Sequence, residues 1–204
     1  MDKKLTTYLI AIPCFDMMDT AFVASLLCMR RVGASKVAFL SNSLVYDARD
    51  RLTREAIESN ADRVLWLDSD MQFGVDLMQR LAEDMDTGMD FVSGLYFKRQ
   101  FPVVPLLSKL QDDKLAPCLD YPKDQVFEVD ATGFGACMMS TKLLKDVVDT
   151  FGSPFYPVAG HGEDYSFCVR ARELGYKLYC DSRIKVGHVG AYVFGEEDYQ
   201  NREL

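Results

Sequence analysis

The chain has 204 residues, of which 49% are hydrophobic and 26% charged, and its formal net charge is −8 at pH 7. This length and apolar content suffice for one sizeable core, so we expect a single domain over residues 1–204. The acidic excess disfavours nucleic acid and anionic membrane surfaces as partners, since both need clustered Lys and Arg. No run approaches the roughly 20 apolar residues of a membrane span, so we expect a cytoplasmic protein.

Cysteine usage agrees with that location. The six cysteines lie mostly inside apolar stretches, and no two of them have the Cys-x-x-Cys spacing of a zinc site. Buried reduced thiols are therefore expected, and not a disulfide framework.

Apolar runs of strand type alternate with helical patterns in the first half of the chain. This alternation predicts an α/β fold, in which a mixed, mostly parallel central sheet carries helices on both faces. The predicted strands are 8–13, 37–40, 64–67 and 91–95, and the predicted helices are 17–31, 45–59 and 75–85.

The second half is less regular. Residues 101–119 hold three prolines in extended stretches, and the small-residue segment 131–136 is typical of a tightly packed turn or of backbone close to a ligand. The charged tail 195–204 is either a flap over a bound ligand or a frayed end, and we favour the frayed end. A strand at 126–129, helices at 141–150 and 163–175 and a strand at 177–181 complete the prediction.

The strand 64–67 ends abruptly in Asp68-Ser69-Asp70. In an open α/β sheet, ligands bind outside the carboxyl ends of the strands. Extended backbone points Asp68 and Asp70 to the same side, about 6 to 7 Å apart. Two such carboxylates can share a divalent cation and its bound phosphates. The alternative is a turn that caps the helix beginning near Gly74.

Two further groups have a chemical and a structural interpretation. Glu163 and Asp164 begin a helix, where a carboxylate either complements the helix dipole or acts as a general base. His188, one of two histidines, lies between Gly187 and Gly190 and is either a packed side chain or a metal ligand.

The order of these residues is similar to that of family-2-like glycosyltransferases with the GT-A (Rossmann-like) fold, and the similarity covers nearly the whole chain. The short length resembles compact members from bacteria and their phages. This resemblance implies a nucleotide-sugar-binding half at 1–97 and an acceptor and catalytic half at 98–204. It is carried by Pro13, Arg49, Asp68-Ser69-Asp70, Gly133-Phe134-Gly135, Glu163-Asp164, Tyr165-Ser166-Phe167, Gly175, Asp181 and His188.

The resemblance also implies a metal centre and a donor site. Asp70 would bind Mn²⁺ or Mg²⁺ directly, Asp68 would contact the ribose or a metal-bound water, and His188 would complete the metal site. A nitrogen ligand favours Mn²⁺ over Mg²⁺. The implied donor contacts are Pro13, Cys14 and Phe15 at the base, Arg49 at the diphosphate unless it is an ordinary surface arginine, and Ser69 and Gly133 nearby.

The implied activity is transfer of a sugar, from a UDP-sugar foremost, to a hydroxyl group of a glycan, protein or other acceptor. Asp164 would be the general base of an inverting reaction, with Glu163 beside it. The chain lacks a Gln-x-x-Arg-Trp segment, which argues against a processive polysaccharide synthase.

Two other classes remain open, as does a homo-oligomer. A nucleotide-sugar-binding module without turnover would keep the same residues. A nucleotidyltransferase is less favoured, because Pro13-Cys14-Phe15-Asp16 is neither glycine-rich nor basic. The acceptor is not identified: Tyr121, Phe155 and Tyr156 either stack on a sugar ring or belong to the core.

Overall fold

A seven-stranded sheet forms the centre of the computed structural model, which describes residues 5–112, 114–158, 160–190 and 192–200. Its strands are β1 (Thr7–Pro13), β2 (Ala34–Leu40), β3 (Arg63–Leu67), β5 (Phe91–Leu95), β8 (Val126–Val129), β10 (Ala136–Ser140) and β11 (Leu178–Lys185). They lie in the order β2-β1-β3-β10-β5-β11-β8. β10 and β8 run antiparallel to the other five, so the predicted mixed, mostly parallel sheet is confirmed.

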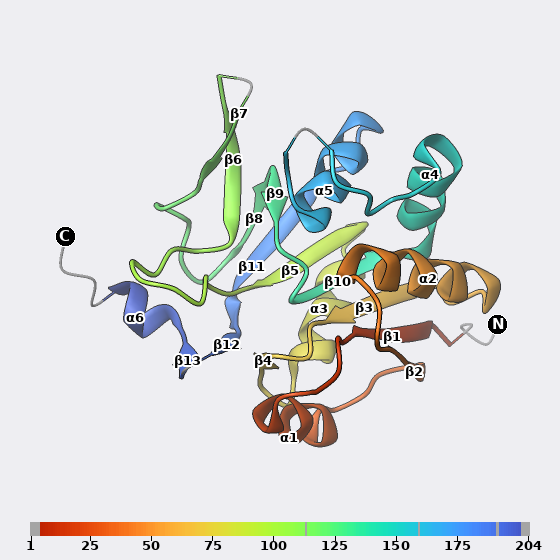
Figure 1. Cartoon of the computed structure of the whole chain (residues 1–204), viewed down its shortest axis with the longest axis horizontal. Coiled ribbons are helices and arrows are strands. Elements are labelled where there is room, and N and C mark those ends of the chain that lie inside the picture. The colour runs from red at the N-terminus through yellow and green to blue at the C-terminus, as the bar shows by residue number, and fades with distance from the viewer. Residues whose placement is uncertain (1–4, 113, 159, 191, 201–204) are drawn as a thin grey trace.

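Helices cover both faces of this sheet, as predicted (Figure 1). On β3, Val64 and Trp66 point into one core, and Leu65 and Leu67 point into the other, because successive side chains alternate across a strand. α2 (Val45–Glu58), α4 (Thr141–Phe151) and α5 (Glu163–Glu173) pack on the first face, and α1 (Thr20–Cys28) and α3 (Leu77–Met85) pack on the second. In the described part of the chain, none of the helices has the length and apolarity needed to cross a bilayer.

Two small sheets extend from the carboxyl edge of the central one. The first has the order β13-β12-β4, and it joins β4 (Met71–Gln72), just after β3, to β12 (Gly187–Val189) and β13 (Val193–Phe194). The second has the order β7-β6-β9 and comprises β6 (Leu107–Gln111), β7 (Lys114–Pro117) and β9 (Ala131–Thr132). The first of these sheets decides the geometry of the candidate site.

Two elements differ from the prediction. The segment 131–136 contains β9 and the tightly packed turn that was one of its two interpretations, but the apolar residues after that turn form β10, an unpredicted strand that inserts between β3 and β5. The helix expected at 17–31 is shorter, because the Asp19 side chain accepts a hydrogen bond from the Ala21 amide (2.8 Å) and starts α1 at Thr20. All six cysteines are free thiols, as expected, and Cys137, Cys168 and Cys180 are buried. The expected burial is wrong for the other three, because Cys28 is exposed and Cys14 and Cys118 are half-buried.

The expectation of a frayed tail at 195–204 is wrong for its described part. Residues Glu196–Gln200 form α6, which packs against the rest of the chain. The Glu196 carboxylate accepts a hydrogen bond from the Tyr121 hydroxyl (3.0 Å) and forms an ion pair with Lys185. Tyr199 is buried beside Tyr121, with ring centroids 5.9 Å apart. The highly charged composition of the tail does not indicate these aromatic and charged contacts.

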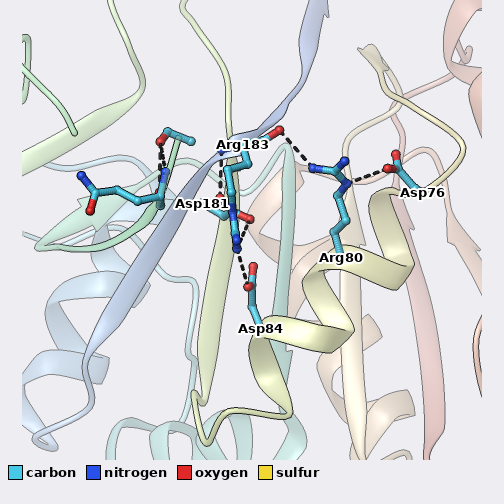
Figure 2. Close-up of polar contacts among 7 residues, drawn as sticks. Asp76, Arg80, Asp84, Asp181 and Arg183 are labelled. Carbon is cyan, nitrogen blue, oxygen red and sulfur yellow. Dashed lines mark hydrogen bonds and ion pairs between the residues drawn. The ribbon is translucent and has the colours of Figure 1, made fainter. Parts of the chain in front are cut away.

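A charged cluster joins α3 to β11 (Figure 2). Arg183 of β11 donates through Nε to Oδ1 of Asp181 (2.8 Å) and through Nη2 to Oδ1 of Asp84 on α3 (3.0 Å). Arg80 of the same helix pairs with Asp76 (2.6 Å). Burial, followed by the neighbouring Asp181, raises the pKa of Asp84 to about 6. Asp181, one of the residues that carried the resemblance, therefore belongs to a buried structural cluster.

This cluster predicts a pH-dependent stability. Because the pKa of Asp84 is raised in the folded chain, the folded state binds more protons, and stability is lost as the pH rises through about 6. Asp84→Asn mimics the protonated acid. We expect it to raise the Tm at pH 7.5 by about 2–4 °C, the shift that 1 kcal/mol produces in a chain of this size, and to change little at about pH 4, where the acid is protonated in the folded chain and partly protonated in the unfolded one.

Thermal unfolding at both pH values measures this difference. Glu58→Gln, an exposed change of the same charge at the end of α2, is the control and should leave the Tm nearly unchanged. An equal response of Asp84→Asn at the two pH values contradicts the prediction.

Candidate active site

The Asp68-Ser69-Asp70 segment lies at the carboxyl end of β3, in the turn that leads into β4. Backbone hydrogen bonds fix it from two sides: the Asp68 amide donates to the Gly135 carbonyl (3.0 Å), and the Asp19 amide donates to the Ser69 carbonyl (2.9 Å). β4 separates the segment from α3, whose N-cap residue is Asp76. The alternative that these residues cap the following helix is therefore wrong.

A buried arginine holds the first carboxylate. Arg49 is 1% exposed, and its Nη2 donates to Oδ1 of Asp68 (2.7 Å) while its Nε lies 3.5 Å from Oε1 of Glu163. The guanidinium lies 5.5 Å from the ring centroids of both Trp66 and Phe134. Burial opposes the charge, but the two carboxylates raise the pKa of Arg49 above its ordinary value. Arg49 is thus not a surface arginine; its contact with a diphosphate stays a prediction.

His188 reaches the site through strand pairing. β12 pairs with β4 so that His188 lies opposite Met71, and the Val189 amide donates to the Asp70 carbonyl (2.8 Å). The imidazole Nδ1–H donates to the Phe97 carbonyl (2.8 Å), and Nε2 lies 3.6 Å from Oδ2 of Asp70. A backbone carbonyl on one ring nitrogen is the usual way to orient a metal-binding histidine.

Arg99, which the sequence did not single out, also contacts Asp70. Its Nη1 lies 2.9 Å from Oδ2 of Asp70 and 3.2 Å from the Val189 carbonyl. Burial alone would raise the pKa of Asp70, but His188 and Arg99 outweigh burial and hold this pKa below its ordinary value. The sequence feature that could have pointed to Arg99 is its position shortly after β5, at the same edge of the sheet as Asp70.

Few side chains at this site could coordinate a metal ion. Within the ranges that the structure describes, no group of three or more His, Cys, Asp or Glu side chains could hold a metal ion. Asp70 and His188 supply one oxygen and one nitrogen that face each other, so further ligands would have to come from water or a bound substrate. That arrangement fits a metal that arrives together with a phosphate-containing ligand.

A cavity of about 390 Å³ opens beside these carboxylates. Its lining includes the polar and charged residues Asp68, Ser69, Asp70 and Arg99, and most of the remaining lining is apolar. The cavity therefore combines charged and apolar surface. The other lining residues are Pro13, Cys14 and Phe15 after β1, and Ser43, Leu44, Val45 and Ala48 at the start of α2.

Asp164 lies in the first turn of α5, next to Glu163. Its Oδ1 accepts a hydrogen bond from the Tyr165 amide (2.7 Å). Burial, followed by the charge of Glu163, raises the pKa of Asp164 to about 6. The predicted position that complements the helix dipole is confirmed, and the raised pKa is also typical of a catalytic carboxylate.

Gly133 allows a close approach at this point. A Cβ atom there would lie 2.0 Å from the Tyr96 hydroxyl oxygen and 3.2 Å from Oδ2 of Asp164. The Tyr96 hydroxyl accepts a hydrogen bond from the Gly135 amide (2.9 Å). Glycine is therefore needed at 133 to seat the tyrosine, and Gly133 and Asp164 lie side by side.

The aromatic residues considered for the acceptor do not gather at the site. Tyr121 and Phe155 are 3% and 0% exposed and belong to the core. Tyr156 is exposed and packs edge-on against Tyr46, with ring centroids 6.1 Å apart.

Comparison with known proteins supports the fold. No family model and no curated protein matches the sequence. Among solved structures, the chain is similar to the A197 protein from STIV, with 18% identity over 91% of this chain and 86% of that one and a TM-score of 0.67. It is also similar to GalNAc-T7 solved with UDP, GalNAc and Mn²⁺, with 13% identity and a TM-score of 0.63. That match covers 93% of this chain but 45% of GalNAc-T7, so the chain spans less than half of that protein. These likenesses show a GT-A fold.

The Arg49 contacts predict a large loss of stability on substitution. Arg49→Met leaves the carboxylates of Asp68 and Glu163 partly buried without their cation, so we expect a loss of about 3–5 kcal/mol in the free energy of unfolding. Urea denaturation measures it. Arg54→Met on the exposed side of α2 is the matched control and should cost little. Equal stability of the two variants contradicts the structural role given to Arg49.

Proposed function

We propose that the chain is a metal-dependent glycosyltransferase that transfers a sugar from a nucleoside-diphosphate sugar, UDP-sugars foremost, to an acceptor hydroxyl group. The observation that carries this proposal is the pairing of β4 with β12, which directs Nε2 of His188 to Oδ2 of Asp70 (3.6 Å) at the edge of the cavity. GalNAc-T7, which has a similar fold, was solved with UDP and Mn²⁺.

Asp70 and His188 fit a divalent cation, and the nitrogen donor favours Mn²⁺ over Mg²⁺. When bound, the metal supplies Lewis-acid stabilisation of the charge that develops on the departing diphosphate. Asp68 has one oxygen occupied by Arg49, and its other oxygen is left for the ribose or a metal-bound water. The metal roles of Asp68, Asp70 and His188 are proposed here on this geometry.

The base of the nucleotide is proposed to lie against the apolar wall of the cavity. Phe15 is 69% exposed and follows Pro13 and Cys14 at the end of β1, and Leu44 belongs to the same lining. A planar base can stack on such an exposed ring and recover the apolar contact that the free protein lacks. Ser69 lines the same cavity and is proposed to lie beside the charged part of the donor. Gly133 and Arg49 are buried outside this lining, and their implied contacts with the donor stay predictions.

Asp164 is proposed as the general base. An acceptor hydroxyl group has a pKa far above neutrality, so a carboxylate that takes the proton during attack accelerates transfer by about 10² to 10⁴. With a pKa of about 6, Asp164 is ionised at neutral pH and is a stronger base than an ordinary carboxylate. Glu163 stays paired with Arg49 beside it. An inverting reaction, with the base opposite the leaving diphosphate, is proposed on this placement.

Calorimetric titration of UDP and GDP, with and without Mn²⁺, tests the donor site. We expect Mn²⁺-dependent binding of one nucleotide and a loss of at least about tenfold in Asp70→Ala and in His188→Ala, since each removes a proposed ligand. His161→Ala, which changes the other histidine of the chain, is the control and should bind like the unmodified protein. Absence of nucleotide binding with every metal tested refutes the proposal.

The rate of UDP release from a UDP-sugar, measured against pH, tests Asp164. We expect kcat/KM to fall as the pH drops below about 6, because protonation removes the base. Asp164→Asn should lower kcat by about 10² to 10⁴ at pH 7.5 while UDP binding stays unchanged. Turnover at the unmodified rate in this variant excludes Asp164 as the base, and nucleotide binding without any turnover points to a binding module.

A further inference from the structure

The positive charge of Arg99 lies next to Asp70, the carboxylate that is proposed to bind the metal ion. Nη1 of Arg99 lies 2.9 Å from Oδ2 of Asp70, the same oxygen that faces Nε2 of His188 at 3.6 Å. The guanidinium therefore offsets the negative charge of Asp70. A divalent ion that binds Oδ2 of Asp70 has to compete with the Arg99 guanidinium, because both cations are attracted by the same carboxylate charge.

Arg99 also faces the cavity in which the donor is proposed to bind. Among the described residues that line this cavity, it is the one Lys or Arg, beside the carboxylates of Asp68 and Asp70. Arg49 does not supply a second cation there, because it is 1% exposed and pairs with Asp68 and Glu163. A guanidinium suits a nucleoside diphosphate, because its planar fork of N–H donors can bind two phosphate oxygens at once.

The backbone around Arg99 allows its side chain to move alone. The Lys98 amide donates to the Val104 carbonyl (2.9 Å), and Phe97 pairs with Pro105, so the base of the loop is fixed. The Arg99 side chain is 48% exposed, so its ion pair with Asp70 and its hydrogen bond to the Val189 carbonyl (3.2 Å) are both open to solvent and weak. Exchange of Asp70 for another anion therefore needs a change of side-chain rotamer and costs little.

We infer that Arg99 is an exchangeable cation of the donor site. It pairs with Asp70 in the free enzyme, and it turns to the diphosphate oxygens of the donor when a divalent ion takes Asp70. This inference rests on the proposed function and adds to it a specific diphosphate-binding residue. It also predicts opposite effects of Arg99 on two ligands: competition with the metal alone, and support of the nucleotide bound with the metal.

Binding of Mn²⁺ alone, followed by electron paramagnetic resonance of the free ion, and calorimetry of UDP and GDP with Mn²⁺ test the inference together. Arg99→Gln should bind Mn²⁺ alone up to about fivefold more tightly, since an exposed competing ion pair is removed. The same variant should bind the nucleotide with Mn²⁺ about tenfold more weakly, since a hydrogen bond to a charged group is lost. For both ligands, Arg99→Lys should have an affinity between that of the unmodified protein and that of Arg99→Gln.

Lys98→Gln is the matched control, because it removes the same charge one residue away and outside the lining of the cavity. It should behave like the unmodified protein in both measurements. If Arg99→Gln matches Lys98→Gln, or binds both ligands more weakly, the inference is overturned while the proposed function stands. If the unmodified protein binds neither Mn²⁺ nor a nucleotide, the proposed function fails and the inference fails with it.

Discussion

A buried positive charge sets the arrangement of the candidate site. The guanidinium of Arg49 lies among aromatic rings, where an unpaired charge would be strongly unfavourable, and it is compensated by Asp68 and Glu163. These two carboxylates come from the end of β3 and the start of α5, so the ion pairs join the two halves of the chain. Side chains proposed to act on a substrate thus serve also as counter-ions of the core, and the stability of the fold and the geometry of the site depend on one another.

The parallel part of the sheet could be predicted from the sequence because its strands are continuous apolar runs followed by helical patterns. Phe91–Leu95 of this part has the predicted bounds, as has the antiparallel strand Val126–Val129, and the carboxylates after Leu67 lie at the edge of the sheet where a site was expected. β10 could not be predicted in this way, since a short apolar run does not encode which strands it will pair with or in which direction. The contact of Arg99 with Asp70 likewise depends on how two loops meet at one sheet edge.

The burial of Arg49 is indicated by the sequence, but the usual exposure of arginine hides this indication. Arginine on a helix is mostly exposed, which is why a surface position was a reasonable alternative. However, Arg49, Leu52 and Ala56 are spaced i, i+3 and i+7, and all three are buried on the same face of α2. The docked α6 is a similar case, because Glu196 and Tyr199 lie three residues apart in a segment whose overall charge suggested a free end.

The insertion of β10 has a consequence for how the chain folds during its synthesis. β3 and β5 are complete by residue 95, yet both pair with β10, which comprises Ala136–Ser140. Until the ribosome has released that segment, the nascent chain exposes the unpaired edges of two apolar strands. Such edges are sites of aggregation, and pairings between distant segments form slowly. The middle of the sheet therefore closes late, and chaperone dependence of the nascent chain is expected to be greatest between the emergence of β5 and that of β10.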